Sequence, residues 1–68
     1  MDVLAENLRA ATERRGLTAE HLARRTGIRP ADVTQYLTGQ ARPCPRHQAV
    51  LALALGTNVA DLHREPEW

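Results

Sequence analysis

The chain has 68 residues, nine arginines against eight acidic residues, and a single cysteine, Cys44. A chain of this length forms one small domain that buries only about 60% of its unfolded surface, which excludes a large catalytic cleft. One cysteine excludes an intramolecular disulfide framework and is typical of a reducing compartment. No apolar run is long enough for a membrane span, and no signal peptide is evident. We therefore expect a soluble cytoplasmic protein.

Positive charge is concentrated in one part of the chain. Residues 9–46 hold eight arginines and three acidic residues, a net charge of +5, whereas residues 1–8 and 47–68 each carry −2. Such a basic stretch is typical of a surface that binds nucleic acid. Every basic residue is arginine, which binds phosphates and base edges through paired hydrogen bonds. A GC-rich coding sequence would produce the same bias.

A first helix is predicted over residues 3–15. Leu4, Leu8 and Ala11 recur on one face of it. Gly16 follows as a residue that commonly ends helices. Charged residues occupy the opposite face, so we expect this helix to pack one side against a core and expose the other.

A second helix is predicted over residues 19–25, and a tight turn joins it to a third. Thr18 is suited to cap the start of the second helix. Its inward residues are Leu22 and Ala23. Gly27 can adopt the positive φ angle that a sharp turn between helices commonly requires.

The third helix is predicted over residues 30–38. Pro30 suits its first position, because the N–H that proline lacks would be unpaired there in any helix. Asp32 favours the positive end of the helix dipole. The apolar face at helical spacing consists of Val33, Tyr36 and Leu37.

Two further helices are predicted in the rest of the chain. A loop over residues 39–45, stiffened by two prolines, leads to a helix over residues 46–55. A short helix follows, anchored by Val59 and Leu62. The helix over 46–55 is apolar on nearly all sides, and such a helix needs cover on more than one face.

The spacing of residues around Gly27 is distinctive. The small Ala23 precedes this glycine by four residues, and the stiff, β-branched Val33 follows it by six. Later landmarks are Gly39, the Arg42-Pro43 loop, the Leu55-Gly56 helix end, Val59 and Leu62. Over residues 4–62 this pattern resembles the helix-turn-helix of the Cro and phage-repressor family of DNA-binding domains. The resemblance implies an all-α, five-helix, lambda-repressor-like domain over residues 1–63, with a short tail over 64–68.

The resemblance implies that the third helix enters the major groove of double-stranded DNA. Arg29 could bind guanine through O6 and N7, and Gln35 could bind adenine through N6 and N7. Pro30 replaces a polar residue of the family, so part of the specificity would come from DNA shape. The expected base-contacting residues are Arg29, Pro30, Ala31, Thr34 and Gln35.

Phosphate contacts are expected around that helix, with Arg42 as the strongest candidate. The family usually has glutamine where this chain has Ala19, so here only the backbone N–H groups of the helix start could reach a phosphate. The expected phosphate-contacting residues are Ala19, Thr38, Gln40, Arg42 and Arg46. Such contacts fix the register of a protein on DNA without reading its sequence.

A weak homodimer, formed in solution or on DNA, is also implied, because relatives meet their two-fold mates near the fourth and fifth helices. The expected interface residues are Val50, Leu53, Thr57, Asn58 and Val59. The alternative cover for Val50 and Leu53 is the C-terminal tail with Trp68.

The expected function is that of a Cro-like repressor, a transcriptional regulator that binds a pseudo-palindromic operator. Its expected location is the cytoplasm, at the nucleoid, or the host cytoplasm if a phage encodes the protein. The histidines lack the spacing of metal ligands, and no nucleophile–base pair or phosphate-binding glycine loop occurs. We therefore expect no enzyme activity, metal, cofactor, small-molecule ligand or membrane contact. The alternative is a helix-turn-helix module that acts on a protein, as an antitoxin or an inhibitor of the transcription machinery. Ala19, Pro30 and the surplus apolar residues favour that alternative.

Overall fold

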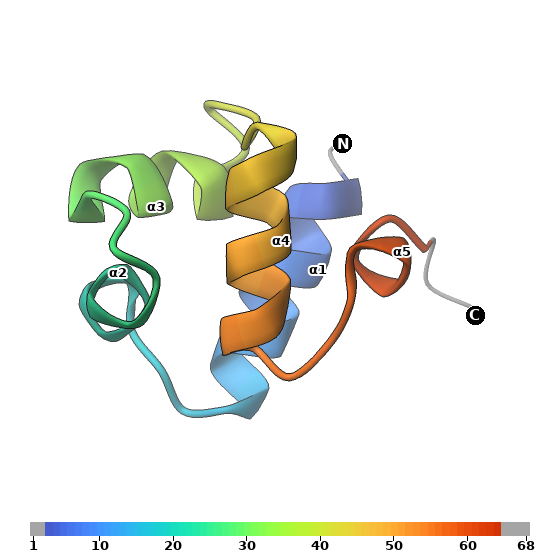
Figure 1. The fold of residues 1–68 in the computed structure, drawn as a ribbon, viewed down its shortest axis with the longest axis horizontal. Helices are drawn as coiled ribbons and strands as arrows, with labels where there is room; N and C mark the ends of the chain where they lie inside the picture. Colours follow the sequence, from blue (N-terminus) through green and yellow to red (C-terminus); the bar gives the residue numbers. More distant parts are fainter. Residues whose placement is uncertain (1–2, 65–68) are drawn as a thin grey trace.

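Five helices and no strands make up residues 3–64, the part of the chain that the computed structural model describes (Figure 1). The helices are α1 (Val3–Arg14), α2 (Ala19–Thr26), α3 (Pro30–Thr38), α4 (Pro45–Ala54) and α5 (Val59–Leu62). The expected all-α, five-helix fold is confirmed, and the predicted helix ends differ from these by one residue at most. Within this part of the chain, no helix is both long and apolar enough to cross a membrane.

The helices enclose one apolar core. In Figure 1, α4 runs in front of α1, with α2 and α3 on one side and α5 on the other. α3 packs against α1 and α2, and α4 packs against α2 and α5. The half-buried Leu37 also packs on this core, as the sequence pattern predicts. The buried core residues are Leu4, Leu8, Ala11, Leu22, Ala23, Ile28, Val33, Tyr36, Leu51, Ala52, Leu55 and Leu62.

Local hydrogen bonds fix both ends of α2. Thr18 Oγ1 accepts from the His21 N–H at 3.2 Å, and His21 Nδ1 accepts from the Thr18 N–H at 3.4 Å. This reciprocal cap satisfies two N–H groups at the helix start. At the other end, Gly27 has a φ angle of 76° and donates its N–H to Ala23 O at 2.8 Å. A side chain would be strained at that angle, so glycine lets the chain turn directly into α3.

Asn7 ties the last helix to the first. Its Nδ2 donates to the carbonyl oxygens of Leu62 at 2.7 Å and Arg64 at 2.8 Å. α5 has only four residues, too few to be stable by its own hydrogen bonds. The buried Leu62 side chain and the Asn7 amide therefore hold α5 in place.

The outer face of α4 is apolar and open to solvent. The Leu53 side chain is 81% exposed, and Val50 is half-buried. This helix therefore has more apolar residues than the core buries, as the sequence predicts. Nothing in residues 3–64 covers Leu53. Trp68, the alternative cover, lies outside the described residues.

Candidate nucleic-acid interface

α3 presents an exposed face beside a buried one. Val33 and Tyr36 point into the core, which turns the opposite side of the helix to solvent. All five residues predicted to contact bases are exposed: Arg29, Pro30, Ala31, Thr34 and Gln35. Pro30 occupies the first helical position, as predicted. The structure thus brings this predicted set together at the start and middle of one helix.

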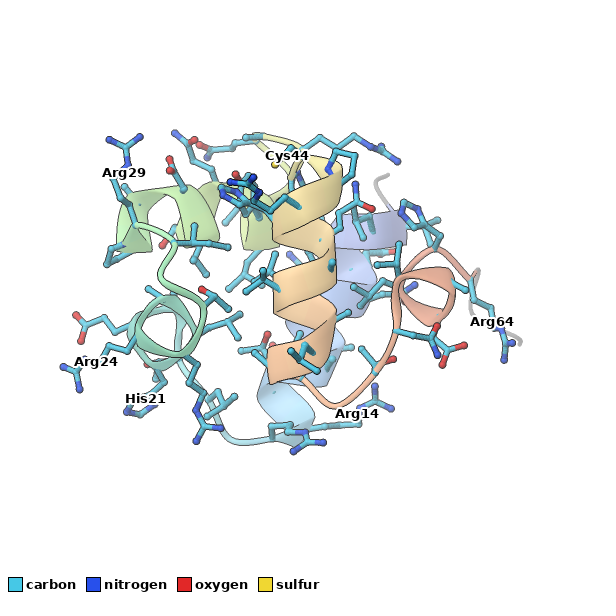
Figure 2. The ribbon with its side chains drawn as sticks, viewed as in Figure 1. Arg14, His21, Arg24, Arg29, Cys44 and Arg64 are labelled. Carbon is cyan, nitrogen blue, oxygen red and sulfur yellow. The ribbon has the colours of Figure 1, made fainter. Side chains whose placement is uncertain are left out.

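Arg29 lies directly before α3 and points away from the body of the molecule (Figure 2). Its Nε lies 3.2 Å from Asp32 Oδ2; the Arg29 side chain is 84% exposed and that of Asp32 is 28% exposed. A surface ion pair of this kind stabilises the fold by less than about 1 kcal/mol. The main effect of this ion pair is to restrict the Arg29 guanidinium beside the first turn of α3, while its high exposure leaves the guanidinium open to a ligand.

The hydroxyl groups of α3 are engaged within the helix. Thr34 Oγ1 donates to Pro30 O at 3.0 Å, and Thr38 Oγ1 donates to Thr34 O at 2.9 Å. A phosphate oxygen needs a donor, and each hydroxyl has one proton. A phosphate contact by Thr38 would therefore require its hydroxyl to rotate.

The loop between α3 and α4 begins with a tight cap. Gly39 has a φ angle of 79°, and the N–H groups of Gln40 and Ala41 donate to Gln35 O at 2.9 and 3.2 Å. These bonds fix the path of the chain towards the exposed Arg42. The other two residues predicted to contact phosphate here, Gln40 and Arg46, are also exposed.

Cys44 occupies the N-cap position of α4 as a free, exposed thiol and forms no side-chain cap hydrogen bond.

The start of α2 offers backbone groups only. Ala19 is half-buried and packs against the core, so its side chain is turned away from a ligand. The first N–H groups of a helix have no acceptor within it and favour an anion such as phosphate. His21 and Arg24 project outward from this helix (Figure 2). The capping role of His21 is not evident from sequence, because a capping box is usually recognised by Glu or Gln at that position.

The arginines do not all face the same way. Figure 2 places Arg14 at the opposite end of the molecule from Arg29. Arg14 and Arg15 line an open groove formed with α5 and the turn before it. Arg9 Nη1 donates to Leu37 O at 3.4 Å, near the end of α3. Arg9 therefore adds to the positive charge beside α3, whereas Arg14 and Arg15 do not.

A second contact unforeseen from sequence joins α3 to α4. The Tyr36 hydroxyl and His47 Nδ1 lie 2.8 Å apart, and their rings are tilted by 60°. Burial raises the pKa of Tyr36 above its ordinary value, and the Asp32 carboxylate raises it further. Tyr36 is therefore neutral at physiological pH and links α3 to α4. Residues 3–64 contain no cluster of side chains that could hold a metal ion.

Comparison with known proteins agrees with this geometry. One class of DNA-binding domain is defined by two helices that a tight turn joins, with one face of the second helix exposed. The chain matches the family model described as a helix-turn-helix domain over residues 3–65. This protein belongs to the helix-turn-helix domain family. No curated protein and no solved structure matches it.

Proposed function

We propose that this protein is a sequence-specific transcriptional regulator of the Cro-like repressor type. The observation that carries the proposal is the exposed face of α3, where five adjacent or helically spaced positions are free of core packing. A helix of nine residues is roughly 13 Å long, which suits a major groove about 12 Å wide. Membership in the helix-turn-helix family supports DNA as the partner.

Base recognition would centre on Arg29 and Gln35. Arg29 is restrained by Asp32, which lowers the entropy lost when its guanidinium binds guanine. Gln35 can bind adenine through its exposed amide, and Ala31 can contact a thymine methyl group. Pro30 has no side-chain donor, so DNA shape would complete the specificity.

Phosphate contacts would supply most of the affinity. The exposed side chains of Gln40, Arg42 and Arg46 follow α3, and the N–H groups at Ala19 begin α2. Thr38 could join them once its hydroxyl rotates.

Two copies would bind a pseudo-palindromic operator, with their α3 helices in major grooves about 34 Å apart. The exposed Leu53 and half-buried Val50 would form the centre of the interface, flanked by Thr57, Asn58 and Val59. Asn58 already caps α5 by accepting from the Asp61 N–H, and Val59 packs on the core, so these two would contribute less. Repression would follow from blocking polymerase on the operator in the cytoplasm.

A titration of the protein against labelled duplexes tests the proposal. One duplex comes from upstream of the protein's own gene, and its scrambled sequence is the control. We expect preferential binding to the first duplex. If two protomers make about six phosphate contacts, affinity should fall roughly 10³-fold between about 50 and 200 mM salt. Salt-sensitive binding without preference would show that the site was wrongly chosen, and selection from random duplexes would then replace it.

A protein-directed role is the second candidate. It is favoured by the 81% exposure of Leu53 and by the alanine at position 19, which offers no side-chain contact to DNA at the start of α2. In this case the protein would act as an antitoxin or as an inhibitor of the transcription machinery. Enrichment of one stoichiometric partner, together with no DNA binding at either salt concentration, would favour it over the repressor.

Substitutions at two arginines should have different consequences. Arg29→Ala should cost roughly 1–3 kcal/mol on the specific duplex and relax preference at one base pair. Arg42→Ala should weaken binding to all duplexes about equally and lower the salt slope by about one for each bound protomer. Binding titrations on single-base variants of the duplex measure both effects.

Arg64→Ala is the matched control, because Arg64 pairs with Asp61 on the side of the molecule away from Arg29 (Figure 2). It removes the same charge and should leave base preference unchanged. A changed base preference in Arg42→Ala would contradict our division of contacts into phosphate and base.

A further inference from the structure

One side chain on α4 joins two segments that are distant in sequence. Gln48 Nε2 donates to the carbonyl oxygen of Pro43 at 2.9 Å, and Gln48 Oε1 lies 2.8 Å from His63 Nε2. Because the amide nitrogen must be the group facing the Pro43 carbonyl, the amide oxygen faces His63. His63 Nε2 therefore carries a hydrogen and donates it.

The His63 end of this chain of hydrogen bonds is firmly held. The carbonyls of the two neighbouring residues, Leu62 and Arg64, both accept from Asn7 Nδ2. The Leu62 side chain is buried in the core. Asn7 on α1 and Leu62 thus place His63, and His63 orients the Gln48 amide.

The Pro43 end lies in the loop that carries Arg42. This loop, residues 39–44, contains Pro43 and is followed by Pro45 at the start of α4; both prolines lack an N–H, so this part of the chain has few backbone donors with which to brace itself. Its first part is held by the bonds to Gln35 O, and its last part by Gln48, whose own N–H also donates to Cys44 O at 2.9 Å. Gln48 therefore fixes the Pro43–Cys44 peptide, one peptide beyond the Arg42–Pro43 bond.

We propose that Gln48 is a positioning residue for DNA binding, which holds the loop over residues 39–44 so that Arg42 meets a phosphate. This inference rests on the proposed function. His63 acts one step further away, because it keeps the Gln48 amide turned towards Pro43. His63, the C-cap residue of α5, thereby contributes to DNA affinity without being one of the proposed DNA-contacting residues.

Two substitutions separate this role from bulk packing. Gln48→Met keeps a long side chain but removes both hydrogen bonds, and we expect about fivefold weaker DNA binding, the loss expected for one ordinary hydrogen bond. His63→Gln retains a donor and should bind nearly as well as the wild type, whereas His63→Ala should behave like Gln48→Met. Leu17→Ala is the destabilising control, since Leu17 packs on the core in the α1–α2 connection, away from the α3–α4 loop (Figure 1).

The decisive measurement is a double-mutant cycle. If Gln48 acts through Arg42, the Gln48→Met/Arg42→Ala double variant should bind DNA no more weakly than Arg42→Ala alone. Additive losses in the double variant would overturn the proposal.

Amide hydrogen exchange in the free protein tests the loop without DNA. Gln48→Met should speed exchange at Arg42 and Cys44, the two N–H groups in the part of the loop that Gln48 holds, and Leu17→Ala should not do so selectively. Unchanged exchange at these amides would overturn the proposal. If the wild type bound no duplex, the proposed function would fail, and with it the role of Gln48 in placing Arg42 against a phosphate. The exchange data would still decide whether Gln48 holds the loop.

Discussion

Leu22→Ala should remove a large part of the folding free energy of this protein. The Leu22 side chain is 0% exposed and lies in the core where α2 meets its neighbours. Truncating a buried leucine to alanine costs about 3–5 kcal/mol, because the transfer energy is lost and a cavity remains. At about 0.05–0.15 kcal/mol per residue, a chain of 68 residues has a total of roughly 3–10 kcal/mol. Urea unfolding followed by circular dichroism should therefore show a midpoint at much lower urea than for the wild type, and near zero if the wild type lies at the lower end of this range.

Leu53→Ala is the matched control, since it makes the same chemical change on a side chain that is 81% exposed. It should alter the free energy of unfolding by no more than about 0.5 kcal/mol. A cost below about 1 kcal/mol for Leu22→Ala would contradict the placement of Leu22 in the core. DNA binding by Leu22→Ala should fall in parallel with its folded fraction, because α2 supports α3.

The fold could be predicted closely because its determinants are local in the sequence. Gly27 lies at positive φ, Pro30 occupies the first position of α3, and Thr18 caps α2, each as its chemistry requires. Apolar spacing alone placed Val33 and Tyr36 inside. Such features need only neighbouring residues to specify them. The helix ends shift by one residue because terminal turns are held by few hydrogen bonds.

What sequence reasoning missed are contacts between residues far apart in the chain. The Tyr36–His47 bond joins α3 to α4, and the Gln48–His63 bond spans 15 residues. Neither has a spacing signature, because each depends on how two helices cross. All three histidines, interpreted from sequence only as lacking metal-ligand spacing, form hydrogen bonds within the fold: His21 caps a helix, and His47 and His63 join elements.

The residues predicted to contact bases and phosphates through their side chains are all exposed. Ala19, which was predicted to offer only its backbone N–H, packs its side chain on the core, and this is compatible with that prediction. The charge argument was less accurate, because Arg14 and Arg15 lie beside α5. A sum over sequence positions cannot tell which face of a helix an arginine occupies.

Leu53→Glu should abolish the proposed dimer with little effect on the fold of each protomer. In a two-fold symmetric interface the same residue is lost from both sides. Burying one leucine is worth about 1.5–3 kcal/mol, so the loss from two copies corresponds to roughly 10²–10⁴-fold weaker self-association. The introduced carboxylates would also repel each other across the interface. Sedimentation of the protein, alone and with an operator duplex, measures the change.

The control is Ala10→Glu, which adds the same charge at an exposed position of α1. It should leave the dimer fraction unchanged, and both variants should unfold at nearly the same urea concentration as the wild type. In the dimer, a protomer bound at one half-site would raise the affinity of the second protomer for the other half-site. Leu53→Glu should remove this gain, so that the two protomers bind their half-sites independently. An unchanged dimer fraction in Leu53→Glu would remove the α4 face as the interface. In that case a partner protein or the C-terminal tail would become the expected cover for Leu53.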